Sequence, residues 1–290
     1  MGELLRARQQ LELAISLYDP ERHRPLLFRY GGLDAEVSCL LHAASTLWQL
    51  GYPDQALKRG NEGLALAQTL SHPFSLAFAE YYFGVLRQYR REARAAKVTV
   101  GALVALSTEH GLTHFLAWGT TLNGWAMAEQ GRDEEGIAQI QEGLAESRAA
   151  EVELMRPYHL CLLAEACTET ARIDDGLGAL SEALAAAEEH EDRQYEAEMH
   201  RLKGELLLRQ GESNIAEVQK CFQRAIEIAR KQSAKSLELR ATLSLARLLE
   251  KQGHRHEART MLTEIYNWFT EGFDTADLKD AKALLAELTG

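Results

Sequence analysis

The sequence predicts an all-α fold: a right-handed superhelical solenoid of antiparallel helix pairs. Three observations lead to it. Turn-forming positions recur about every 40 residues along the chain, a period typical of stacked helix pairs. Small and apolar residues recur at fixed distances before these turns. The five prolines all fall outside the helices that the pattern predicts, and no segment alternates polar and apolar residues as a half-buried strand would.

The repeated frame consists of a turn residue followed by small or apolar residues about five and twelve positions later. In one copy an arginine, Arg90, takes the place of the turn glycine, and Ala95 and Ala102 are the two small residues. A helix A is expected to end at each turn residue, and a helix B to begin about two positions later. The turn residues are Gly2, Gly51, Arg90, Gly131, Ala171, Gly211 and Gly253.

Two further columns support the frame. The position seven residues before each turn is small in five of six repeats, and the position four residues before is always apolar. Small side chains let neighbouring helix axes approach, and the apolar residue one turn away fills the interface. The first column is Ala44, Phe83, Gly124, Ala164, Gly204 and Ala246; the second is Leu47, Leu86, Met127, Cys167, Leu207 and Leu249.

The frame predicts one solenoid over residues 1–290. An incomplete first unit and a long connection occupy residues 1–33, where residues 3–18 form a helix B without a helix A before it. Because a solenoid unit cannot bury its apolar face alone, we hypothesise that the chain is part of a longer protein. Residues 273–290 are expected to be a capping helix with an apolar stripe. The helix-pair repeats between them are 34–72, 73–112, 113–152, 153–192, 193–233 and 234–272.

Composition excludes several classes of protein. The formal net charge of -11 disfavours nucleic-acid and anionic-membrane surfaces, which need a basic face. No apolar run is long enough to span a membrane, and the charged N-terminus is no signal peptide. Four cysteines in so long a chain favour reduced thiols and a cytoplasmic location.

The motifs of common catalytic and metal sites are missing from the sequence. It has neither a phosphate-binding P-loop nor an HExxH zinc motif. Cys161 and Cys167 stand six positions apart on a predicted helix, so they do not share a face as metal ligands would. The sequence therefore predicts no enzyme activity, no cofactor and no metal.

Two copies of the frame, YPDQALKRGNEGLALA at 52–67 and EEGIAQIQEGLAESRA at 134–149, resemble tetratricopeptide repeats. The period is longer than the roughly 34 residues of that family, which implies longer helices. Segments such as WFTEGFDTADLKDAKALLAEL at 268–288 look like the C-terminal array of bacterial adenylate/guanylate cyclase–ATPase fusion regulators and of related large ATP-binding transcription activators. This resemblance implies a regulatory or interaction role, with any catalytic domain upstream.

In tetratricopeptide-like stacks the A helices line the concave face, so their inward positions are candidate binding residues. The N-terminal half of this face is aromatic and the C-terminal half is charged, both of which suit binding hot spots. The tryptophans could instead pack against the next unit, and Arg201 could pair with Glu205 within one helix. The candidates are Trp48, Glu80, Arg87, Trp118, Thr121, Trp125, Tyr158, Glu165, Arg201, Glu205, Arg240 and Arg247.

The favoured function is a non-catalytic scaffold that holds a protein or peptide segment in its concave groove and signals to upstream domains of a larger bacterial protein. A small-molecule inducer sensor and a self-association module are the alternatives. The expected partners are therefore proteins or peptides, with a homo-oligomer possible and with neither nucleic acid nor membrane.

Overall fold

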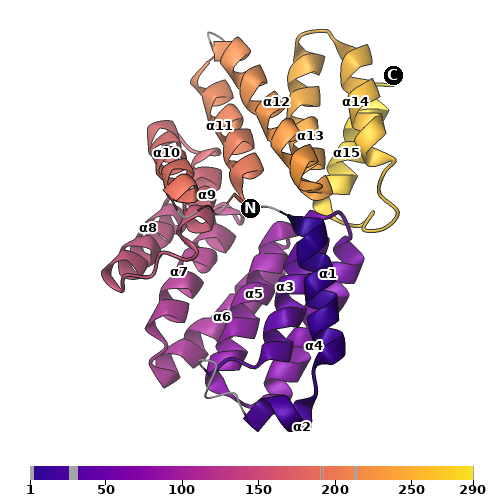
Figure 1. Cartoon of the computed structure of the whole chain (residues 1–290). Helices are drawn as coiled ribbons and strands as arrows, with labels where there is room; N and C mark the ends of the chain where they lie inside the picture. The colour runs from indigo at the N-terminus through magenta and orange to yellow at the C-terminus, as the bar shows by residue number, and fades with distance from the viewer. Residues whose placement is uncertain (1–2, 26–31, 190, 192, 212–213, 290) are drawn as a thin grey trace. The chain divides into compact units, whose positions relative to one another are not determined.

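The computed structural model describes residues 3–25, 32–189, 191, 193–211 and 214–289, which form helices and turns and contain no strand (Figure 1). The all-α class is thereby confirmed. The first helices are α1 (Leu4–Leu17), α2 (Pro20–His23), α3 (Ala35–Gln49), α4 (Pro53–Leu70), α5 (Pro73–Tyr89), α6 (Ala93–His110), α7 (Thr113–Ala128) and α8 (Asp133–Ala149). The others are α9 (Arg156–Cys167), α10 (Ile173–Glu189), α11 (Glu196–Gln210), α12 (Ile215–Gln232), α13 (Lys235–Lys251), α14 (Arg255–Tyr266) and α15 (Ala276–Glu287).

The chain divides into two compact units. Leu4–Trp48 and Pro53–Met155 form the first, which we call the N-terminal unit. Met1–Glu3, Gln49–Tyr52 and Arg156–Gly290 form the second, the C-terminal unit. Each is described by itself below.

Several helices of the N-terminal unit begin or end at residues that are typical of helix ends. Pro53 and Pro73 are the first residues of α4 and α5, where a missing N–H costs no helical hydrogen bond. The ring of His72 accepts a hydrogen bond from the Ser75 amide and so caps α5. At the other end of the pair, Gly111 takes a left-handed conformation (φ 64°) that closes α6.

Helices α7 and α8 approach to backbone contact through glycines. A Cβ added at Gly124 would lie 2.6 Å from the carbonyl oxygen of Gly136, and one at Gly136 would lie 2.7 Å from the Ala128 amide nitrogen. A Cβ at Gly143 would lie 2.6 Å from the Ala117 carbonyl oxygen. The small positions of the frame are therefore required by a close helix–helix packing, as the sequence pattern predicts.

Phe83, which the sequence pattern places in the small column, is next to a glycine on a neighbouring helix; with Arg91 as the turn residue, the small position of α5 is Gly84. Phe83 of α5 is buried, and a Cβ at Gly60 of α4 would lie 2.8 Å from its ring. The glycine on the neighbouring helix thus supplies the space that Phe83 occupies. In the C-terminal unit the roles are exchanged, because Gly204 of α11 lies against the ring of Phe222 of α12.

The predicted frame is one residue out of register at the α5–α6 turn. Arg91, and not Arg90, has the left-handed conformation (φ 58°), and Ala96 and Leu103 fill the buried positions five and twelve residues later. The exposed Ala102 was wrongly predicted to do so. Arg90 instead ends α5 in a helical conformation and donates a hydrogen bond to the carbonyl oxygen of Pro53. Helix α5 thus ends two positions before the left-handed residue, as α3 ends two positions before Gly51.

The C-terminal unit pairs α9 with α10, α11 with α12 and α13 with α14, and α15 follows α14 (Figure 1). Its core lies between α12, α13, α14 and α15, with Phe222, Leu249 and Leu262 nearly inaccessible. Leu278 and Ala281 of α15 are buried in the same core. The apolar stripe expected of residues 273–290 is therefore packed against the preceding pair.

Substituting Gly124 with alanine tests the close approach of α7 and α8. We expect Gly124→Ala to lower the free energy of unfolding by about 2 kcal/mol, because its Cβ has no room beside Gly136 and Ile140. Gly101→Ala is the control. Gly101 lies in α6 with no atom within 4 Å of an added Cβ, so this variant should have a free energy of unfolding that is up to about 1 kcal/mol higher. Chemical denaturation measures both, and two changes of the same sign would contradict the packing.

Candidate interaction face

The aromatic candidates of the N-terminal unit are core residues. The exposed fractions of Trp48, Trp118 and Trp125 are 3%, 5% and 0%. Trp48 stacks on Tyr89 with 4.5 Å between ring centroids, and Trp118 lies 4.8 Å from Tyr81. The expectation that these tryptophans line an open groove is wrong, because α5 and α7 are covered on almost every side.

The polar candidates of the N-terminal unit are also largely covered. Thr121 is fully buried, and its hydroxyl donates a hydrogen bond to the carbonyl of Ala117. Arg87 forms an ion pair with Glu92, and its guanidinium lies 4.8 Å from the centroid of the Phe83 ring. Both side chains are therefore committed to packing within the unit.

Glu80 is a buried acid whose pKa is set by burial alone among the described residues. Its exposed fraction is 7%, and the described residues give its carboxylate no hydrogen bond or ion pair. Burial raises the pKa of Glu80 from 4.5 to about 7, because the charged form loses its hydration without compensation. This candidate is therefore a titratable group near neutral pH.

The charged candidates of the C-terminal unit come together in one ion-pair network. Arg201 donates to both carboxylate oxygens of Glu198, at 2.7 and 3.0 Å, and contacts Glu205 at 3.4 Å. Burial lowers the pKa of Arg201, but the carboxylates of Glu198, Glu205 and Glu165 outweigh it and the pKa is raised. The guanidinium is thus a permanent cation surrounded by acids.

Arg240 extends the network from α11 to α15. Its guanidinium lies 2.8 Å from Asp277 and 3.8 Å from Glu198. Burial opposes the charge on Arg240, yet Asp277, Glu198 and Glu165 raise its pKa overall. Because Asp277 and Glu198 come from different helices, this arginine holds three helices together.

An exposed ion pair lies on the same helices α13 and α15, and the buried Ser244 joins the network itself. Arg247 of α13 is exposed and lies 3.8 Å from Asp280 of α15. The hydroxyl of Ser244 donates to Glu205 at 2.5 Å. We call the whole set the A-helix face of the C-terminal unit: Glu165 on α9, Glu198, Arg201 and Glu205 on α11, Arg240, Ser244 and Arg247 on α13, and Asp277 and Asp280 on α15.

Sequence reasoning found only part of this face. Asp277 and Asp280 were missed because α15 was considered only for its apolar stripe; the signal was two aspartates three positions apart along one edge of that stripe. Tyr158, predicted to lie in the groove, is buried and packs 5.1 Å from the ring of Tyr195. It contributes to the core of the unit and not to its surface.

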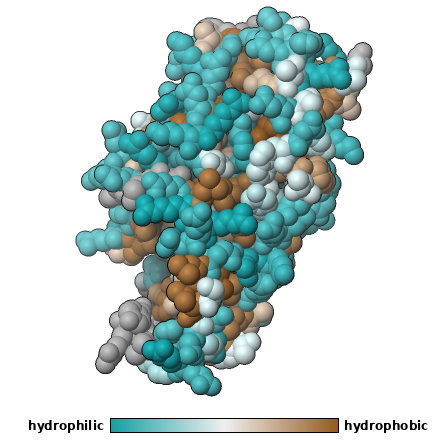
Figure 2. All heavy atoms as spheres, turned by 45° about the vertical axis from the view of Figure 1, so that its right-hand side comes forward, coloured by the Kyte–Doolittle hydropathy of each residue, from teal (hydrophilic) through white to brown (hydrophobic). Residues whose placement is uncertain are grey.

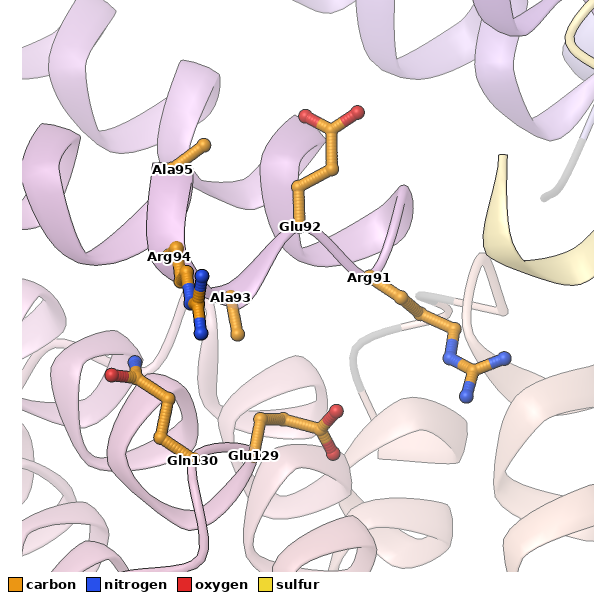
Figure 3. A pocket seen from close by; sticks show the side chains of 7 residues that line it. All are labelled: Arg91, Glu92, Ala93, Arg94, Ala95, Glu129 and Gln130. Carbon is orange, nitrogen blue, oxygen red and sulfur yellow. The ribbon is translucent and has the colours of Figure 1, made fainter. Parts of the chain in front are cut away.

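A cavity of about 740 Å³ lies elsewhere, at the turn between α5 and α6 and at the end of α7 (Figure 3). Arg94 points toward Gln130, whereas Glu92 points away from both (Figure 3). The lining is formed by Arg91, Glu92, Ala93, Arg94, Ala95, Glu129 and Gln130. It holds no serine, cysteine or histidine and none of the aromatic candidates.

The described part of the chain has neither a cluster of metal ligands nor a membrane-spanning helix. Nowhere in it do three or more histidine, cysteine, aspartate or glutamate side chains gather as metal ligands would. No helix within the same residues combines the length and the apolar character needed to cross a membrane.

Comparison with known proteins finds one curated relative and several solved structures. No protein-family model matches the chain. An uncharacterised protein of Rhizobium meliloti (strain 1021) is 27% identical over 251 residues, which cover 86% of this chain and 24% of the relative. The chain thus spans about a quarter of the length of that protein.

The solved structures share the fold at low sequence identity. The apo form of RapI has a TM-score of 0.60 at 10% identity and covers 98% of this chain and 99% of its own. A Rap protein complexed with competence and sporulation factor has a TM-score of 0.61 at 13% identity, covering 99% of this chain and 74% of its own. Yeast Tom70 reaches 0.50 at 13% identity over 99% of this chain and 55% of its own. These likenesses establish a tetratricopeptide-like helical repeat and nothing about activity.

Removing Arg240 tests whether the network contributes to stability. Arg240→Met leaves Asp277 buried without its cation, so we expect the free energy of unfolding to fall by about 3 kcal/mol or more. Adding Asp277→Leu to this variant should recover most of the loss. Arg224→Met is the control, because Arg224 forms an exposed pair on α12 and should change stability by less than about 0.5 kcal/mol. Equal losses for the single and double variants would contradict the model of an uncompensated charge.

Glu80→Gln tests the buried acid. Because the folded pKa is raised, the folded state binds the extra proton, so Glu80 makes stability fall as pH rises from 4.5 to about 7. We expect the variant to match the parent at low pH and to exceed it by up to about 3 kcal/mol above pH 7. Urea denaturation across this pH range measures the difference. Glu142→Gln, at an exposed position of α8, should leave the dependence of stability on pH unchanged. If the stability of Glu80→Gln changes with pH in the same way as that of the parent, the raised pKa of Glu80 is contradicted.

Proposed function

We propose that the protein is a non-catalytic scaffold that binds a protein or peptide segment on the A-helix face of the C-terminal unit. The observation that carries this proposal is the row of charged side chains that crosses four helices, from Glu165 on α9 to Asp280 on α15. Such a row offers an extended partner successive polar contacts on rigid helices, which suits a peptide better than a compact ligand.

The charge of this face defines the partner it suits. Five carboxylates stand against three guanidiniums, and the buried arginines are already paired with acids. Two carboxylates, Glu205 and Asp280, stand beside one exposed guanidinium, Arg247, which pairs with Asp280, so the accessible surplus is negative. A segment carrying lysine, arginine or a free amino terminus would complement it and gain specificity from the match.

The structural neighbours are compatible with this role. One Rap protein was solved with competence and sporulation factor, and the Rap conjugation gene regulator of plasmid pLS20 was solved with the Phr* peptide. The second has a TM-score of 0.60 at 11% identity, covering 99% of this chain and 72% of its own. Peptide binding is a property of those proteins, and it supports the same use of a similar fold here.

The proposal includes a place in a larger system. The resemblance to C-terminal arrays of bacterial cyclase–ATPase regulators suggests that partner binding is transmitted to attached domains in the cytoplasm. An inducer pocket is the weaker alternative. The aromatic side chains that would line it are packed in the core, and the cavity at Arg91 is lined by none of them.

Selection from a displayed random-peptide library tests the proposal. We expect the protein to select peptides rich in basic residues, and Asp280→Lys to weaken their binding at least tenfold, or by about 1.4 kcal/mol. The matched control is Glu227→Lys, which makes the same charge change in an exposed glutamate paired with Arg224 on α12. Isothermal titration measures both affinities.

The control decides how a loss is interpreted. Equal weakening by Asp280→Lys and Glu227→Lys would show a general charge effect and would contradict a site on this face. Failure to select any peptide that binds the folded protein would contradict the scaffold itself.

A further inference from the structure

The three arginines of the A-helix face fall into two groups. The side chains of Arg201 and Arg240 are 14% and 8% exposed, and they donate hydrogen bonds to carboxylates at 2.7 and 2.8 Å. Arg247 is 51% exposed, and 3.8 Å separate its guanidinium from the carboxylate of Asp280. That distance is too long for a hydrogen bond, so charge attraction alone holds this pair. Of the three, Arg247 is therefore the arginine that can leave its carboxylate without breaking a buried contact.

The carboxylate that pairs with Arg247 is accessible to a partner. The side chain of Asp280 is 35% exposed on α15, which contacts α13. In the view of Figure 2, hydrophilic residues form most of the molecular surface, with smaller hydrophobic patches between them. Exposed ion pairs on such a surface contribute little to stability, because both ions are well hydrated when they separate. A cation that arrives at Asp280 can therefore replace Arg247 at little cost.

A second carboxylate is within reach of Arg247 on its own helix. Glu250 stands three positions after Arg247 in α13, a spacing at which helical side chains meet. The Glu250 side chain is 26% exposed and lies 3.7 Å from Arg255 of α14. When the guanidinium of Arg247 leaves Asp280, it can turn toward Glu250 and water. It then no longer faces the place that a partner would occupy.

We infer that Arg247 is an internal competitor for the basic side chain of the partner. In the free protein it occupies Asp280, and it yields this carboxylate when a cation of the partner arrives. The inference rests on the function proposed above, because it concerns the same face and the same kind of partner. A lysine or arginine of the partner carries the charge of Arg247. If Arg247 stayed in place, the arriving cation would meet a like charge at the carboxylate that it needs.

Such a competitor makes the face selective among basic segments. A segment with a single basic residue gains from Asp280 only by outcompeting Arg247, which is tethered beside that carboxylate. A segment that also contacts Glu205, 28% exposed on α11, is held by a second ion pair while it displaces Arg247. Arg247 thus raises the requirement above a single positive charge, which excludes weakly basic segments.

Competition differs from simple repulsion in one measurable respect. A guanidinium that only repels the partner weakens binding whether or not Asp280 carries a charge. A competitor weakens binding because it occupies that carboxylate, so its effect disappears when the carboxylate is removed. The effects of substituting Arg247 and Asp280 are therefore expected to be coupled, and a double-mutant cycle measures the coupling.

The cycle uses a basic peptide selected against the parent protein. We expect Arg247→Met to bind this peptide about fivefold more tightly than the parent, because the competing pair is lost. In an Asp280→Asn background, the same substitution should change the affinity by less than about twofold. Isothermal titration measures the affinities of the parent, the two single variants and the double variant. Unfolding curves verify that all four are folded.

Arg224→Met is the matched control. Arg224 is 54% exposed and pairs with Glu227 at 3.5 Å on α12, so this substitution removes the same charge from a similar ion pair outside the A-helix face. The peptide should bind this variant as it binds the parent.

The outcomes separate this inference from the function on which it rests. Three results overturn the inference while peptide binding stands: unchanged affinity of Arg247→Met, equal strengthening by Arg224→Met, or a fivefold gain that persists with Asp280→Asn. If neither the parent nor any variant binds a basic peptide, the scaffold proposal fails and the inference fails with it.

Discussion

Every helix pair in this chain has an apolar face that only its neighbours can cover, and close coverage requires helices that approach to backbone contact. Gly124, Gly136 and Gly143 meet this requirement between α7 and α8, where a side chain would collide with a carbonyl oxygen or an amide. The rest of the architecture depends on this approach. Because the helices approach so closely, the A helices lie between their neighbours, and most residues of α5 and α7 are buried.

The same constraint explains which features could be predicted from the sequence. Helix limits, turns and the small and apolar columns are local or periodic, and they appear in the pattern directly. The register slip at Arg91 could not be predicted, because an arginine in a left-handed turn leaves no glycine to mark it. That Trp118 and Trp125 are buried could not be predicted either. A helical wheel gives the direction of a side chain, but the neighbours decide whether that direction ends in solvent or in another helix.

For the charged half of the predicted groove, the shared face could be predicted but the partners could not. Arg201, Glu205 and Arg240 were expected on one face, and they share that face because charges at a helix interface must be paired or solvated. Their partners across helices could not be predicted, since Asp277 lies 37 positions after Arg240 and no local pattern joins the two. The network therefore combines two roles that sequence reasoning treats as alternatives: it stabilises the unit and gives its surface a charge.

The shared arginines also determine how this array can change in length. Repeat arrays commonly gain or lose whole units, because each unit contacts only its neighbours. Here Arg240 is neutralised jointly by α11 and by α15, on either side of its own helix. Deleting α15, or inserting a new pair before it, would separate the buried Arg240 from Asp277. The network thus disfavours the insertion or loss of a repeat between α11 and α15.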